Sequence, residues 1–80
     1  MADVINVENK LKKIIASQLN IKEDKLVNDA RIIEDLGADS LDIVEMFIAL
    51  EHEFDLTIPD EEVKGLMTVG KIIDYIKSVL

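Results

Sequence analysis

The 80-residue sequence contains no cysteine or tryptophan, one proline, one histidine and three other aromatic side chains. The absence of cysteine excludes disulfide bonds, thiolate metal sites and a thiol nucleophile supplied by the chain. The longest uninterrupted apolar run, residues 46–50, is far too short for a membrane span. A chain of this length supports one modest core, so we expect residues 1–80 to form a single domain.

Basic residues are also scarce, with nine Lys and Arg against seventeen Asp and Glu and a formal net charge of −8. This acidic excess argues against binding to nucleic acids or anionic membranes, because both would repel the chain. It favours basic protein partners. Asp3 and Glu8 do not suit a signal or transit peptide. We therefore expect a cytoplasmic monomer with no nucleic-acid partner and no stable membrane association.

Apolar spacing predicts four helices. The first spans about residues 4–19 and the second runs from Asp39 or Ser40 to about Phe54. A short third helix opens at Pro59 or Asp60 and ends at Gly65, and a fourth follows Thr68 as its N-cap. The fold class is thus all-α: a small four-helix bundle with a short third helix and a long first loop, residues 20–39. In that loop we expect apolar groups to pin the chain to the core, and a helical turn near Ile32 is one option.

The acidic charge is concentrated in one segment, residues 34–62, which holds eleven carboxylates and no Lys or Arg. One interpretation is a solvated helix face. The other is that this unneutralised block steers the chain toward a basic partner, since like charges four residues apart, as at Glu51 and Asp55, mildly destabilise a helix.

The apolar residues of the predicted second helix fall on two sides, because successive residues of a helix turn by about 100°. Ile43, Phe47, Leu50 and Phe54 cluster on one side and form the expected core face. Apolar and charged residues share another side: Leu41, Val44, Ile48, Glu45, His52 and Asp55. This side is either a docking surface, where charge guides approach and aliphatic groups supply contact, or a face that neighbouring segments cover.

Ser40 differs from Ser17 and Ser78 because it lies where the long loop enters the second helix. A helix N-terminus favours a phosphate attached there. Ser40 either caps the helix or, if Asp39 caps it, keeps a free hydroxyl. His52 cannot activate it, since twelve residues of helix separate the two by about 18 Å along the axis. We expect no catalytic residues and no metal site.

Residues 35–42, D-L-G-A-D-S-L-D, begin a pattern that continues with Val44-Glu45, residues 49–51, Glu53-Phe54 and the I-P-D-E-E segment at 58–62. This pattern resembles the acyl carrier proteins over essentially the whole chain. The resemblance implies that Ser40 carries phosphopantetheine, which a phosphopantetheinyl transferase moves from coenzyme A. Acyl groups would travel as thioesters on the arm's thiol in fatty acid biosynthesis, a part of lipid metabolism.

The same resemblance implies a set of docking residues: Asp39, Leu41, Asp42, Glu45 and Ile48. Their partners would be malonyl transacylase, ketoacyl synthases, reductases, the dehydratase and acyltransferases. The acyl chain is expected to enter the core between the second and third helices, near Phe47, Leu50, Ile58 and Val63. His52, Gly70 and the run Gly65-Leu66-Met67 depart from the family pattern. His52 makes one element of the acidic face pH-dependent. Gly70 and residues 65–67 are expected to loosen the third-helix region.

Two other functions remain open at this level. A carrier of the same fold could serve polyketide or aminoacyl chemistry. An acidic interaction protein could bind a basic partner without ever receiving a prosthetic group.

Overall fold

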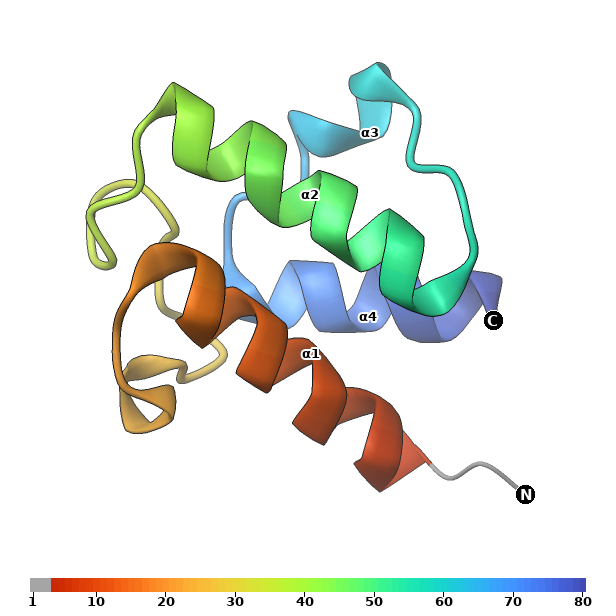
Figure 1. Cartoon of the computed structure of the whole chain (residues 1–80), viewed down its shortest axis with the longest axis horizontal. Helices are drawn as coiled ribbons and strands as arrows, with labels where there is room; N and C mark the ends of the chain where they lie inside the picture. Colours follow the sequence, from red (N-terminus) through yellow and green to blue (C-terminus); the bar gives the residue numbers. More distant parts are fainter. Residues whose placement is uncertain (1–3) are drawn as a thin grey trace.

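The computed structural model describes residues 4–80 and consists of helices joined by loops (Figure 1). Along the chain these are α1 (Val4–Leu19), the 3-10 helix η1 (Glu23–Lys25), α2 (Ser40–Phe54), α3 (Asp60–Val63) and α4 (Val69–Val79). The predicted four-helix bundle with a long first loop and a short third helix is confirmed, and residues 4–80 contain no strand. Asp3 lies outside the described residues.

The core lies between three helices, with α1 packed against both α2 and α4. Figure 1 shows α1 and α2 on opposite sides of α4 in projection, with α3 beyond α2. On α2 the predicted Phe47 and Leu50 are buried, whereas Ile43 and Phe54 are only half-buried. The expected core face did not include Met46, which is fully buried. Met46 lies on α2 at the edge of that face, about 60° from Ile43.

The long loop between α1 and α2 is ordered by burial and by hydrogen bonds. Leu26, Ala30 and Ile32 are buried in the core, while Val27 and Ile33 point to solvent. The expected turn near Ile32 is present, because the amides of residues 35 and 36 both donate to the carbonyl of residue 31. The loop also contains η1, which periodicity did not indicate.

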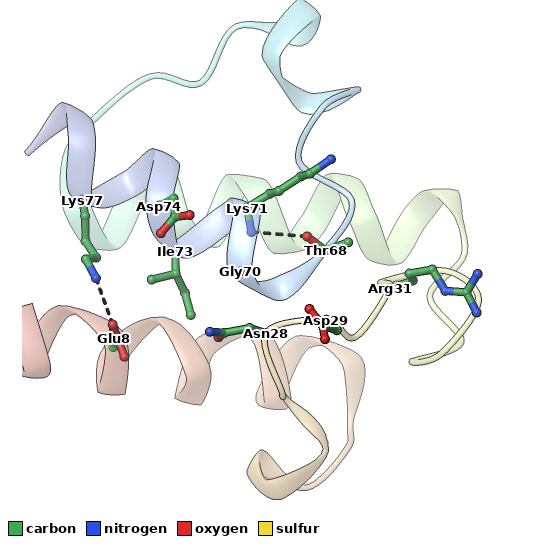
Figure 2. Close-up of a pocket in the computed structure, with 10 residues that line it drawn as sticks. All are labelled: Glu8, Asn28, Asp29, Arg31, Thr68, Gly70, Lys71, Ile73, Asp74 and Lys77. Carbon is green, nitrogen blue, oxygen red and sulfur yellow. Dashed lines mark hydrogen bonds and ion pairs between the residues drawn. The ribbon is translucent and has the colours of Figure 1, made fainter.

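This loop is joined to the start of α4 by three backbone hydrogen bonds. The amide of Val69 donates to the carbonyl of residue 30 at 3.0 Å, and the amide of Gly70 donates to the carbonyl of residue 28 at 2.9 Å. In the opposite direction, the amide of Ile32 donates to the carbonyl of residue 67 at 2.9 Å. Figure 2 shows Gly70 beside Asn28, and a Cβ on Gly70 would lie only 3.1 Å from the Asn28 carbonyl oxygen. Gly70 thus permits a close backbone approach that fastens the loop, rather than loosening the third-helix region.

One ion pair crosses from α1 to α4. Lys77 Nζ donates to Glu8 Oε2 at 2.9 Å, as drawn in Figure 2. The hydrogen bond and charge of Lys77 lower the pKa of Glu8. The Thr68 hydroxyl accepts from the Lys71 amide at 3.3 Å, which confirms Thr68 as the α4 N-cap. No helix within residues 4–80 has the length and apolar character needed to cross a membrane.

Candidate functional site

The N-terminus of α2 is closed by a reciprocal pair of carboxylates. Asp39 Oδ1 accepts from the Asp42 amide at 2.8 Å, and Asp42 Oδ2 accepts from the Asp39 amide at 3.1 Å. This is a capping box in which Asp39 is the N-cap and Ser40 the first helical residue. Of the two alternatives for the cap, the structure selects Asp39.

Ser40 is consequently exposed, and its hydroxyl has no hydrogen-bond partner among residues 4–80. The amides of Ser40 and Leu41 also lack an acceptor within this part of the chain. They belong to the first helical turn, where amides have no intrahelical partner and the helix dipole favours negative charge. A phosphate ester on the Ser40 oxygen would therefore meet two free N–H groups at the helix end.

The segment before Ser40 is held by a tight turn and one arginine. Gly37 adopts a φ of 76°, the left-handed region where glycine is favoured. Arg31 donates to both carboxylate oxygens of Asp35, with Nε and Nη2 distances of 3.2 Å, and its amide donates to the same carboxylate at 2.8 Å. These contacts lower the pKa of Asp35 and raise that of Arg31. Buried Ala38 then anchors the chain as it enters the capping box.

The face of α2 that leads away from Ser40 is open. Leu41, Val44 and Ile48 are 63%, 54% and 56% exposed, so the alternative that neighbouring segments cover this face is wrong. Glu45 is exposed on the same helix, and Asp42 is half-buried by its role in the cap. All five predicted docking residues thus lie at the start of α2 or along its open face.

The acidic segment is less uniform than its sequence indicates. Asp35 pairs with Arg31, and Glu53 lies 3.6 Å from Lys10 on α1. The expectation of a fully unneutralised block is therefore wrong at these two positions. Arg31 lies just outside the segment, four residues before Asp35, whereas Lys10 is distant in sequence and approaches Glu53 only in the fold. The other nine carboxylates of residues 34–62 have no Lys or Arg within ion-pair distance among the described residues.

The four residues predicted to receive an acyl chain are part of the core. Phe47, Leu50 and Ile58 are buried and Val63 is half-buried, all in one hydrophobic cluster. An open pocket of about 590 Å³ lies elsewhere, between α1, the long loop and α4, as Figure 2 shows. It is lined mostly by polar residues. A chain entering near Phe47 would instead have to displace packed side chains.

Ser40 and His52 lie on the same continuous helix. Helix α2 runs without interruption from Ser40 past His52, so the twelve-residue separation inferred from sequence holds in the fold. Within the described part of the chain, no group of three or more His, Asp or Glu side chains could hold a metal ion.

Comparison with known proteins assigns this arrangement to a class. Residues 9–76 match a family model described as a phosphopantetheine attachment site. Phosphopantetheine is thus the prosthetic group of the class, and a free serine hydroxyl at a helix N-terminus fits its attachment.

Sequence identity to curated proteins identifies the family within this class. The chain is 55% identical over 73 residues to the acyl carrier protein of Buchnera aphidicola subsp. Acyrthosiphon pisum (strain 5A), with 91% of each chain covered. It is 56% identical over 73 residues to that of Buchnera aphidicola subsp. Schizaphis graminum (strain Sg), covering 91% of this chain and 92% of the relative. This chain belongs to the acyl carrier protein family.

Proposed function

We propose that the Ser40 oxygen is the attachment point of phosphopantetheine, on which this chain carries acyl groups as thioesters for fatty acid synthesis. The observation that supports this most directly is that the cap of α2 does not use the Ser40 side chain. Asp39 and Asp42 complete the cap by themselves, which leaves the Ser40 hydroxyl exposed and unpaired within the described residues.

Attachment makes the chain the substrate of a phosphopantetheinyl transferase. The Ser40 oxygen forms a phosphodiester with the phosphorus nearest the pantetheine, while the phosphoanhydride bond of coenzyme A breaks and adenosine 3′,5′-bisphosphate leaves. The Ser40 proton passes to a base of the transferase. When bound, the group supplies a thiol that forms thioesters. The chain has no cysteine, so no thiol of its own competes for the acyl group.

The open face of α2 is the proposed docking surface, defined by Asp39, Leu41, Asp42, Glu45 and Ile48. Unpaired carboxylates attract Arg- and Lys-bearing surfaces, and exposed aliphatic side chains supply contact area. Partners are the transferase, malonyl transacylase, ketoacyl synthases, reductases, the dehydratase and acyltransferases. Contacts dominated by exposed charge are screened by salt, which suits a carrier that must leave each enzyme.

The carrier itself is proposed to be a non-catalytic, monomeric, cytoplasmic single domain. Its core near Phe47, Leu50, Ile58 and Val63 shelters the acyl chain between delivery steps. Few aromatic side chains and many aliphatic ones give this core the ability to repack.

Intact-mass spectrometry tests the attachment site. After incubation with coenzyme A and a phosphopantetheinyl transferase, the chain should gain one phosphopantetheinyl group. Ser40→Ala should gain none, and the control Ser17→Ala should be loaded like the wild type. An unmodified wild-type chain would favour the acidic interaction protein instead.

A pair of matched variants tests the docking surface. Leu41 on α2 and Val27 on the long loop are similarly exposed, at 63% and 60%. Leu41→Ala should lower the transferase kcat/KM roughly tenfold, the effect of removing about 1.4 kcal/mol of contact, with little change in melting temperature. Val27→Ala should leave kcat/KM unchanged. Equal effects of the two variants would contradict the assignment of this face.

A further inference from the structure

Among the carboxylates of the acidic segment that accept a backbone amide, Glu51 in the last turn of α2 has the partner most distant in sequence. Its Oε2 accepts from the amide of Ile58 at 2.7 Å, across seven residues of sequence. Its backbone carbonyl also accepts from the amides of Asp55 and Leu56, where Asp55 adopts a left-handed φ of 54°. One residue thus holds both ends of the segment 55–58 that leads toward α3.

This contact explains why a carboxylate is tolerated at a half-buried position. Glu51 has no Lys or Arg partner among the described residues. A partly desolvated carboxylate without a cation is costly unless hydrogen bonds satisfy it, and a backbone amide is a strong donor to an ionised acceptor. The Ile58 amide satisfies Glu51, which therefore differs from Glu45, the exposed carboxylate of the docking surface that lies outside the capping box.

The bond also fixes the distance between two walls of the core. Glu51 follows Leu50 on α2, and its partner amide belongs to Ile58, which is 5% exposed. Leu50 and Ile58 lie in the same buried cluster. Any movement that separates Ile58 from α2 must lengthen the 2.7 Å hydrogen bond.

We propose that Glu51 is a positioning residue that sets the free-energy cost of opening the core to an acyl chain. The inference rests on the proposed function, in which the chain enters near Phe47, Leu50, Ile58 and Val63. Entry between Leu50 and Ile58 breaks the contact from Glu51 Oε2 to the Ile58 amide. The intact contact favours the closed core, and its removal shifts the acyl chain toward the sheltered state.

The first test uses the unloaded chain, so it does not depend on acyl binding. Amide hydrogen exchange at Ile58 is compared with that at Ile15, a fully buried residue of α1 that reports global opening. Glu51→Ala should accelerate exchange at Ile58 roughly ten- to a hundredfold more than at Ile15, the effect of losing a hydrogen bond to a charged acceptor. Glu51→Gln keeps a neutral oxygen acceptor and should fall between Ala and the wild type.

Asp55→Asn is the matched control, because it removes one negative charge four residues from Glu51, at a carboxylate with no Lys or Arg partner among the described residues, and leaves the contact from Glu51 to Ile58 in place. If Glu51 acted only through charge repulsion, Glu51→Ala, Glu51→Gln and Asp55→Asn would change exchange alike. That result, or unchanged exchange at Ile58 in Glu51→Ala, overturns the assignment of the contact. Glu51→Gln also keeps the test available if the alanine variant folds poorly.

The second test uses chains loaded with an octanoyl thioester and measures cleavage by hydroxylamine. A sheltered thioester reacts slowly, so Glu51→Ala should be cleaved several-fold more slowly than the wild type, with Glu51→Gln between them and Asp55→Asn like the wild type. Cleavage in Glu51→Ala as fast as or faster than in the wild type overturns the proposed control of opening. If octanoyl and acetyl thioesters are cleaved equally fast in every variant, the sheltering function itself fails, whatever Ile58 exchange shows.

Discussion

The capping box at Asp39 lends itself to a quantitative test, because it both stabilises α2 and leaves Ser40 free. Asp39→Ala removes the acceptor of the 2.8 Å hydrogen bond from the Asp42 amide. Losing an N-cap costs about 1 kcal/mol, and about 1 kcal/mol shifts the melting temperature of a domain this small by about 4–8 °C. We expect a fall of that size in thermal unfolding followed by circular dichroism.

Asp39→Asn is the control, because the amide oxygen still accepts from Asp42 while the negative charge is lost. Its cost should be limited to the loss of charge near the helix dipole, a few tenths of a kcal/mol. Equal losses in Asp39→Ala and Asp39→Asn would refute the assignment of the cap.

The same pair of variants links stability to function. Without Asp39, the hydroxyl of Ser40 becomes the nearest side-chain acceptor for the free amides of the first turn. The transferase kcat/KM should therefore fall more in Asp39→Ala than in Asp39→Asn. Equal transferase rates would show that the cap does not keep Ser40 available.

Three further predictions concern stability. Gly70→Ala should lower the free energy of unfolding in urea by about 1 kcal/mol, because its Cβ would meet Asn28 atoms at 3.1 and 3.2 Å. The control Gly65→Ala would place its Cβ 3.7 Å from the nearest atom and should unfold at the wild-type urea midpoint or higher. Lys77 lowers the Glu8 pKa, so the pair stabilises the fold above about pH 4.5 and loses its contribution as pH falls through the lowered pKa. Glu8→Gln should therefore have a lower melting temperature than the wild type at pH 7 and the same melting temperature at strongly acidic pH. A difference that persists in acid would contradict this. NaCl or Mg²⁺ should raise the melting temperature by screening the nine carboxylates without ion-pair partners. A melting temperature that stays constant or falls as salt is added would argue against repulsion among them.

Local features of the fold could be predicted from sequence because each depends on neighbouring residues. Apolar spacing predicts α1 and α2, and Thr68 and Asp39 are identified as cap candidates by their side chains. Which of Asp39 and Ser40 caps α2 was undecided, since both are good caps. The structure decides it through the reciprocal bond from Asp42, which Ser40 cannot match at this register.

Features that depend on distant segments could not be predicted. The approach of Asn28 to Gly70 joins positions 42 residues apart, and the Lys10–Glu53 pair crosses from α1 to α2. The bond from the Ile58 amide to Glu51 depends on the left-handed turn at Asp55. At the candidate site, the sequence indicated Ser40 and the outward face of α2. The pair of Arg31 and Asp35 spans only four residues, whereas the pair of Lys10 and Glu53 required the fold.

Fragmentation mass spectrometry of the loaded chain tests the central claim most directly. After reaction with coenzyme A and a phosphopantetheinyl transferase, the chain is digested and the modified peptide sequenced. The account predicts a single phosphopantetheinyl group on the oxygen of Ser40, in the peptide that begins after Arg31. A group found on Ser17, Ser78 or a threonine, or no group at all, would contradict it.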